Sequence, residues 1–168
     1  MGAKQKQSGF TIVELLIVIV VIGILAAITI VAYNGIQSRS YNAAVQADMR
    51  NIANQIEQYR SINGVYPGSA DLASMGIKAS KNAYLLTTPR PFAYCAVPSG
   101  AASGFGIGGV SKGDRGFYYS STQGMKERTT WNSSSGITIC SAFGVDTADA
   151  GFIYVWGYFN DAWSAWVN

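Results

Sequence analysis

One acidic residue, Glu14, lies inside an almost uninterrupted apolar run near the start of the chain. The run covers residues 10–32, and Glu14 is the single charge among those 23 residues. A carboxylate at the centre of a bilayer costs about 2.5–3.5 kcal/mol on insertion scales, so a segment selected only to span a membrane should lack one. The sequence therefore demands a partner or a location that compensates the charge of Glu14.

Two cysteines, Cys95 and Cys140, could also do chemistry, and both lie in stretches that resemble strands. In an exported protein an even number of cysteines favours a disulfide, which would stabilise the fold by about 4 kcal/mol through loop closure. Two buried free thiols are the alternative, because spacing alone cannot prove pairing.

Patterns typical of enzymes and metal sites are weak. The chain has no histidine, the commonest general base and metal ligand, and it contains no nucleophile elbow, P-loop or recognisable carboxylate pair. Residues 106–109 are predicted to be a flexible loop rather than a phosphate cradle. Asp146 and Asp149, with Asp161 further on, fit a solvated acidic loop better than a calcium site. We expect a protein that is not an enzyme and has no cofactor and no metal.

The charge composition indicates an exported surface. Charged residues make up 12% of the chain, about half the usual share, and the net charge is +3. Lys4 and Lys6 precede the apolar run, and without residues 1–9 ten cations face nine acids. This near neutrality gives no strong nucleic-acid signature.

The apolar run is long enough to cross a membrane. As a helix, residues 10–32 would extend about 34 Å, which exceeds the hydrocarbon thickness of a bilayer. Lys4 and Lys6 predict a cytoplasmic N-terminus, with everything after Tyr33 outside. A standard secretory signal would have a shorter apolar region followed by a cleavage site, so any cut here should fall before the apolar segment.

A second helical pattern, amphipathic in character, covers residues 33–62. Its apolar residues recur every three or four positions and predict packing against a sheet, although a seam for a partner helix is the alternative. Asn63 and Gly64 supply the stop signal. The apolar stripe consists of Tyr41, Val45, Met49, Ile52, Ile56 and Tyr59, and the polar faces carry Gln37, Arg39, Asp48, Arg50, Asn54, Glu57 and Arg60.

Residues 63–168 are predicted to form a globular antiparallel sheet, which makes the fold class α+β. Strands are expected at residues 92–97, 116–121, 137–143 and 152–159, separated by glycine-rich breaks at 99–109 and 132–136. A short helical turn is expected at 70–75 and a short extended piece at 83–86. The last strand is predicted to be central in the core, with an aromatic surface for adhesion or subunit contact as the alternative. Trp163 and Trp166 are the candidates for exposure.

The beginning of the chain resembles the class III signal peptide of type IV pilins and related pseudopilins. Residues 8–16 read SGFTIVELL, and the similarity continues through GILAAI at 23–28 to Ala32 and Tyr33. It covers about 25 residues, and the Gly-Phe junction with a Glu four residues after the Phe is its specific part. The remainder is similar only in plan, with a long N-terminal helix, a variable sheet and a late cysteine pair.

The resemblance implies a role for each residue of the opening stretch. Residues 1–9 would be a leader that a prepilin peptidase removes between Gly9 and Phe10, after which it methylates the new amine of Phe10. Residues 10–32 would span the membrane before assembly and form the filament core afterwards. In the filament, the Glu14 carboxylate would neutralise the Phe10 ammonium of an adjacent subunit. The alternative is that Glu14 snorkels to the cytoplasmic interface of an ordinary anchor helix.

The resemblance also implies a function and partners. The chain would be a structural subunit of an extracellular pilus, a helical filament of its own copies that supports adhesion, twitching motility or DNA uptake. Minor pilins and an assembly platform in the inner or cytoplasmic membrane would be further partners. A pseudopilin of a type II secretion or competence system, and a membrane-anchored binding module that never polymerises, are the alternatives. Family members often have proline where Val31 stands, so unwinding of the helix around Gly23 and Gly35 is a weaker expectation here.

Overall fold

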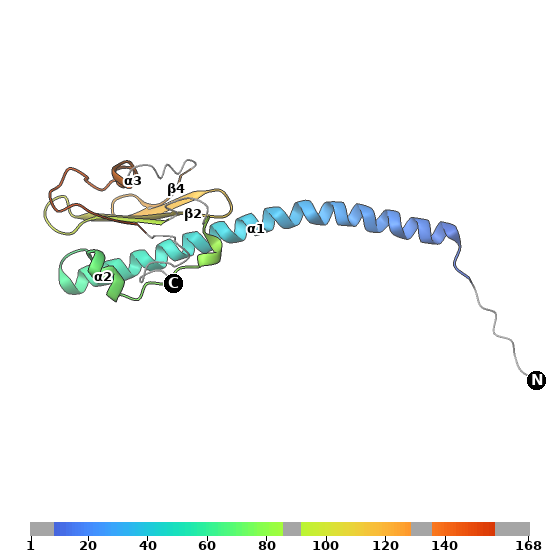
Figure 1. Cartoon of the computed structure of the whole chain (residues 1–168), viewed down its shortest axis with the longest axis horizontal. Helices are drawn as coiled ribbons and strands as arrows, with labels where there is room; N and C mark the ends of the chain where they lie inside the picture. The colour runs from blue at the N-terminus through green and yellow to red at the C-terminus, as the bar shows by residue number, and fades with distance from the viewer. Residues whose placement is uncertain (1–8, 86–91, 129–135, 157–168) are drawn as a thin grey trace, which may run out of the picture. The chain divides into compact units, whose positions relative to one another are not determined.

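The computed structural model describes residues 9–85, 92–128 and 136–156 (Figure 1). The chain divides into two compact units, Met1–Gln37 and Ser38–Asn168, here called the N-terminal unit and the head. A long helix and an antiparallel sheet confirm the α+β class. The elements are α1 (Ile12–Asn63), α2 (Ser69–Ser74), the 3₁₀ helix η1 (Lys81–Ala83), β1 (Phe92–Val97), β2 (Gly104–Val110), β3 (Gly116–Ser120), β4 (Gly124–Arg128), α3 (Gly136–Ala142) and β5 (Ile153–Trp156).

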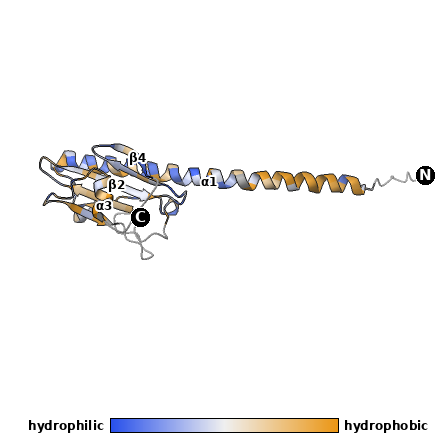
Figure 2. Ribbon diagram, turned by 90° about the horizontal axis from the view of Figure 1, so that it is seen from above, coloured by the Kyte–Doolittle hydropathy of each residue, from blue (hydrophilic) through white to orange (hydrophobic). Residues whose placement is uncertain are grey.

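The N-terminal unit contains the first part of α1, which is apolar on all sides (Figure 2). Every side chain of this unit that the structure describes is exposed. Helix α1 has no break at Gly23 or Gly35. It is also, within the described part of the chain, the one helix long and apolar enough to cross a membrane.

In the head, α1 packs one face against the sheet as the amphipathic pattern predicts. Val45, Met49, Ile52 and Ile56 are buried, while Tyr41 and Tyr59 are partly buried. They share a core with sheet residues whose side chains point toward α1, namely Phe92, Tyr94, Ala96, Phe105, Ile107 and Phe117. The helix ends at Asn63, and Gly64 follows with a φ of 77°, the left-handed conformation typical of a C-terminal cap.

The sheet is antiparallel throughout and has the strand order β4-β3-β2-β1-β5. Its second face carries α3 (Figure 1). The alternate residues of β1 point to that face and form a second core with α3 and the segment after it. This second core consists of Ala93, Cys95, Val97, Tyr118, Ile139, Cys140, Phe143 and Val145.

Two predictions along the sheet were wrong. Of residues 137–143, predicted as a strand, all but Phe143 belong to helix α3, which buries Ile139 and Cys140 against the sheet together with Phe143 just after its end. The glycine-rich segment expected to be a loop at 99–109 contains strand β2. The aromatic ring of Phe143 occupies the space beside Gly106, where a Cβ atom would lie 2.5 Å from the Cβ of Phe143. Strand β4 was not predicted.

The remaining strand predictions are confirmed in part. Strands at 92–97 and 116–120 and the helical turn at 69–74 agree with expectation. The short extended piece expected at 83–86 is confirmed in part: Ala83 ends η1, Tyr84 is extended and makes an isolated bridge to Ser111, and residue 86 lies outside the described residues. The strand predicted at 152–159 is present as β5, but its predicted central place was wrong: β5 pairs with β1 at the edge of the described sheet, and residues 153–155 are only partly buried. Residues 157–159, Trp163 and Trp166 lie outside the described residues.

Candidate assembly site at the start of helix α1

The predicted cleavage junction is exposed. Phe10 is 86% exposed, and a Cβ atom built on Gly9 would meet nothing within 4 Å. The packing of the chain itself therefore does not require glycine at this position.

Thr11 and Glu14 form a capping box at the first turn of α1. The Thr11 backbone N–H donates to Glu14 Oε2 at 2.8 Å, and the Thr11 hydroxyl donates to the same oxygen at 2.7 Å. In return, the Glu14 backbone N–H donates to Thr11 Oγ1 at 3.3 Å. These bonds satisfy two backbone donors that a helix N-terminus otherwise leaves unpaired. The sequence signal was available in the T-x-x-E spacing of residues 11–14, but sequence reasoning did not use it.

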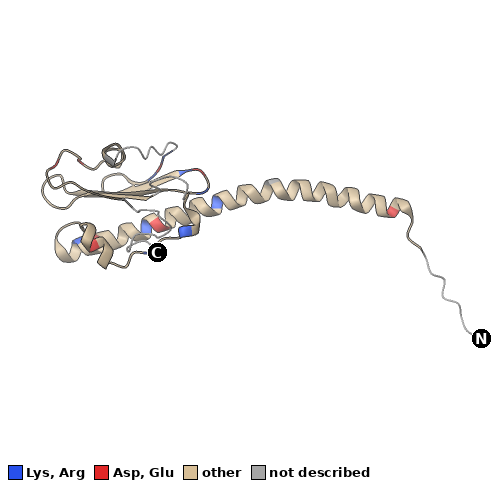
Figure 3. Ribbon diagram, in the orientation of Figure 1, with Lys and Arg blue, Asp and Glu red and all other residues tan. Residues whose placement is uncertain are grey.

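The capping box orients the Glu14 carboxylate without neutralising it. Both bonds end on Oε2 and come from neutral groups, and no ion pair within the described residues involves Glu14. A carboxylate offers about four acceptor positions, so the group can keep its cap and accept a further donor. Glu14 is the one charged residue among residues 10–32, and Figure 3 shows the apolar part of α1 almost entirely in tan. The capping box therefore fixes a negative charge, with no ion-pair partner among the described residues, on an otherwise apolar surface.

Comparison with known proteins places this arrangement in a family. Residues 4–30 match the family model of the prokaryotic N-terminal methylation motif. The chain is 32% identical over 137 residues to the type IV wide pilus major component PilA4 of Thermus thermophilus, an alignment that covers 81% of this chain and 98% of PilA4.

The chain belongs to the type IV pilin-like family.

Two further relatives support this membership of the pilin-like family. The fimbrial protein EcpC of Eikenella corrodens is 43% identical over 79 residues, which are 47% of this chain and 50% of EcpC. The type II secretion system core protein G of Escherichia coli is 33% identical over 67 residues, 40% of this chain and 46% of that protein. The chain thus spans about half the length of these two relatives. Family membership also confirms that the chain is a structural protein rather than an enzyme.

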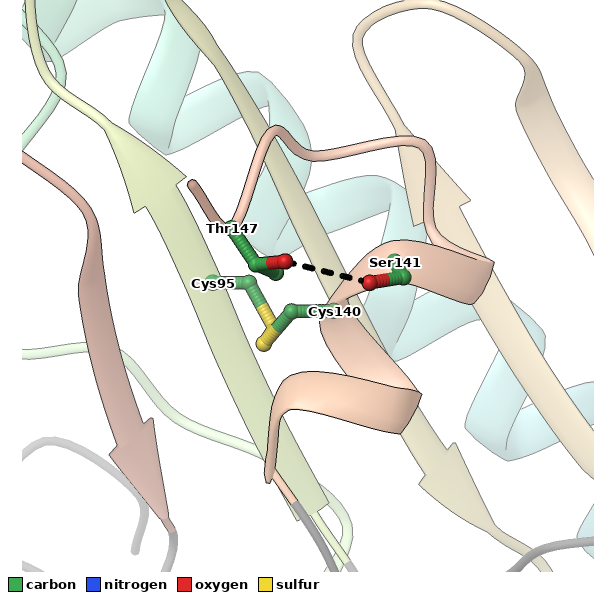
Figure 4. The surroundings of a disulfide bond; sticks show 4 residues. All are labelled: Cys95, Cys140, Ser141 and Thr147. Carbon is green, nitrogen blue, oxygen red and sulfur yellow. Dashed lines mark hydrogen bonds between the residues drawn. A yellow bond between two sulfur atoms is a disulfide. The ribbon is translucent and has the colours of Figure 1, made fainter. Parts of the chain in front are cut away.

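The predicted disulfide of this pilin-like chain is present (Figure 4). Cys95 in β1 is bonded to Cys140 in α3, with 5.6 Å between their Cα atoms, and both residues are buried. The bond joins the sheet to α3 beside a hydrogen bond between the hydroxyls of Ser141 and Thr147, whose oxygens are 3.3 Å apart. The alternative of two free thiols is therefore wrong, as is the expectation that Cys140 lies in a strand.

The acidic residues considered for calcium make local turns. Asp146 Oδ1 accepts the Ala148 N–H at 2.9 Å, and Asp149 Oδ1 accepts the Gly151 N–H at 2.7 Å. Within residues 9–85, 92–128 and 136–156, no group of three or more His, Cys, Asp or Glu residues could hold a metal ion. Asp161 lies outside the described residues.

Asp48 was predicted on a polar face of α1, and this prediction was wrong. The side chain is buried, and its carboxylate accepts the Ser80 N–H at 2.7 Å, the Ser80 hydroxyl at 3.2 Å and the Tyr84 hydroxyl at 3.2 Å. These bonds compensate the burial of a charge and join α1 to the segment around η1. Burial, with the nearby Asp48 carboxylate, raises the pKa of Tyr84 well above its usual value.

Proposed function

We propose that this pilin-like chain is a structural subunit of an extracellular type IV pilus. The observation that carries the proposal is the N-terminal unit, whose apolar helix surface is exposed on all sides and carries the single charge of Glu14. Apolar surface of this extent needs a cover, which the bilayer supplies to the anchored subunit and neighbouring copies supply in the filament. Residues 10–32 are thus membrane span before assembly and filament core after it.

Maturation creates the partner that Glu14 lacks. Phe10 is joined to Gly9 by a peptide bond, so a positive charge arises there only when the leader of residues 1–9 is removed. Prepilin peptidase makes this cut and methylates the Phe10 amine, which keeps its charge. In the filament, the Glu14 carboxylate of one subunit forms an ion pair with the Phe10 ammonium of its neighbour. Two charges that are each costly in an apolar setting then compensate each other.

The remaining segments and partners have roles that complement the N-terminal helix. Residues 33–62 form the amphipathic helix that supports the sheet, and residues 63–168 complete the globular head. An assembly platform in the cytoplasmic membrane, with the N-terminus on the cytoplasmic side, moves subunits from the bilayer into the filament, and minor pilins join them there. Adhesion, twitching motility and DNA uptake are the activities such a filament supports.

A pseudopilin of a type II secretion system is the second candidate. It is favoured by the resemblance to protein G, for which identities reach 33%. The pilus is the stronger candidate because the alignment with PilA4 extends over 98% of that protein, whereas the alignments with protein G cover about 45% of theirs.

Filaments sheared from the native host test the proposal. Electron microscopy should show long surface filaments, and their mass spectrum should show this chain beginning at an N-methylated Phe10 with Cys95 and Cys140 bonded. A chain that keeps Met1 and stays monomeric in the membrane would contradict the proposal and favour a tethered binding module. Secretion failure on deletion, without surface filaments at native expression, would instead favour the pseudopilin.

A further inference from the structure

The exposed and partly buried charged residues at the two ends of the head differ in net sign. One end, here called the basic end, lies where β2 turns into β3 beside the first turns of α1 in the head. Among its exposed and partly buried residues that the structure describes, five cations face two acids, a net charge of +3. The cations are Arg39, Lys81, Lys112, Arg115 and Arg128, and the acids are Asp114 and Glu127.

Contacts within the head bring the basic end together. A Cβ atom on Gly113 would collide with the Ser38 carbonyl oxygen and with Asn42, so the β2–β3 turn lies directly on α1. The Lys112 N–H donates to the Ala83 carbonyl at 2.8 Å, and its ammonium lies 5.8 Å from the centre of the Tyr41 ring. Arg39, Lys112 and Arg115 are all exposed, although Arg115 forms an ion pair with Glu127.

The opposite end, here called the acidic end, lies where β1 and α1 finish and β5 begins. Among the described residues it carries four acids, Glu57, Asp71, Asp146 and Asp149, against one cation, Arg60, a net charge of −3. The Tyr66 N–H donates to the Pro98 carbonyl at 3.0 Å, and a Cβ atom on Gly151 would lie 3.9 Å from Pro98, so these segments adjoin. Asp146 is exposed and Asp149 partly so.

The two ends are too far apart to neutralise each other. Arg39 and Glu57 are 18 residues apart in α1, which corresponds to about 27 Å. The Debye length at physiological salt is about 8 Å, so solvent ions screen each end from the other. Each end therefore presents its own charge to whatever molecule approaches it.

We propose that the basic end of one head binds the acidic end of a second copy, head to tail along the filament. Unlike ends that meet in this way form a heterologous contact, which repeats without closing and so builds a helical polymer. An anionic lipid surface would match the basic end alone and leave the acidic end without a partner, whereas a second copy accounts for both. The inference rests on the proposed function, because it requires that the chain polymerises.

Charge reversal at one end and at both ends tests the pairing in full-length chain. We expect Arg39→Glu with Lys112→Glu, and separately Asp146→Lys with Asp149→Lys, to lower the sheared filament fraction of total subunit several-fold through like-charge repulsion. Combining all four substitutions restores opposite charges and should return that fraction to within about twofold of wild type. Added salt should partly rescue the one-end variants.

Matched controls separate charge from folding. Arg50→Glu reverses one charge at an exposed position of α1 that belongs to neither end and should leave filament yield unchanged. Asp146→Asn with Asp149→Asn keeps side chains that can form the local turns but removes the charges, and should give a smaller loss than the lysine variant. The amount of disulfide-bonded subunit in the membrane should be equal in all variants.

The outcomes distinguish the pairing from the proposed function. Normal filament yield in both one-end variants, or a combined variant worse than either of them, would overturn the pairing alone. A loss confined to the basic-end variant, with weaker binding of that subunit to phosphatidylglycerol vesicles, would overturn it in favour of a lipid surface. Absence of filaments from the wild type would overturn the proposed function, and the pairing with it.

Discussion

At the scale of single residues, Glu14 has a local task in the structure, and we propose an intermolecular one for it. Its hydrogen bonds with Thr11 begin helix α1, and no ion pair among the described residues neutralises its charge. A glutamine can make the same capping bonds, because the box accepts Glu or Gln at this position. The two tasks can therefore be separated by substitution.

Glu14→Gln should retain the helix start and remove the charge, whereas Glu14→Ala removes both. If compensation of the Phe10 ammonium is the essential task, both variants will be cleaved normally but will assemble few or no filaments. Filament yield by shearing, with the subunit mass as the control for cleavage, measures this. Wild-type filaments from the glutamine variant would show that the cap, and not the charge, is what assembly needs.

Gly9→Leu should stop maturation while leaving the folded head intact. The position is open in the structure, so the substitution disturbs no packing, and any effect must come from the peptidase that recognises the junction. The intact mass should equal that of the full chain with unmethylated Phe10. A variant whose N-terminal mass matched the processed wild type would contradict the assignment of the cleavage site.

At the scale of elements, the sheet and α3 fit closely around Gly106. Phe143 contacts this glycine and stacks on Tyr118, with 5.0 Å between ring centres. Gly106→Ala would place a methyl group against the Cβ of Phe143, which cannot move without its backbone. The substitution should lower the free energy of unfolding by about 1–3 kcal/mol. Chemical denaturation of the detergent-solubilised chain measures the change. Gly104→Ala is the matched control, because its nearest contact is the Ser121 hydroxyl at 3.2 Å, and it should cost less.

The contact between α1 and the η1 segment should weaken at alkaline pH. Burial raises the pKa of Tyr84 and of Tyr94, so the folded chain favours their neutral phenols. Their contribution to stability is complete below the unfolded value of about 10 and is lost as the pH rises above it. The free energy of unfolding can be measured between about pH 8 and about pH 11, on either side of the unfolded tyrosine pKa. It should fall less steeply with pH for Tyr84→Phe than for wild type. An identical slope would contradict this assignment.

These elements show what the sequence could and could not predict. The α1 stripe and strands β1 and β3 follow from local periodicity, and the Cys95–Cys140 pair followed from an even count. Helix α3 and strand β2 did not, because the local preferences of Ile and Gly there are overridden by packing between Gly106 and Phe143. Asp48 was misplaced because its partners, Ser80 and Tyr84, are more than 30 residues away in the chain. The capping box of Thr11 and Glu14, by contrast, was readable and was missed.

At the scale of the whole molecule, the two units of the chain meet different surroundings. The N-terminal unit presents apolar side chains that need lipid or other helices, whereas the head has its own two cores and charged ends. The hydrophobic effect holds the helices together without fixing their relative positions, whereas charges at fixed positions select the register between neighbouring subunits. A filament built from this chain should therefore combine strong packing along its axis with salt-sensitive selection of neighbours.

The order of the disulfide and the last strand in the sequence has a consequence for biogenesis. Cys140 precedes β5, so in a chain exported as proposed, oxidation can close a covalent ring that runs from β1 through β2, β3 and β4 to α3 before β5 has crossed the membrane. Until β5 arrives, β1 offers bare backbone donors and acceptors along its outer side. The time between ring closure and docking of β5 is thus the interval in which a newly exported subunit is open to strand invasion by a neighbour.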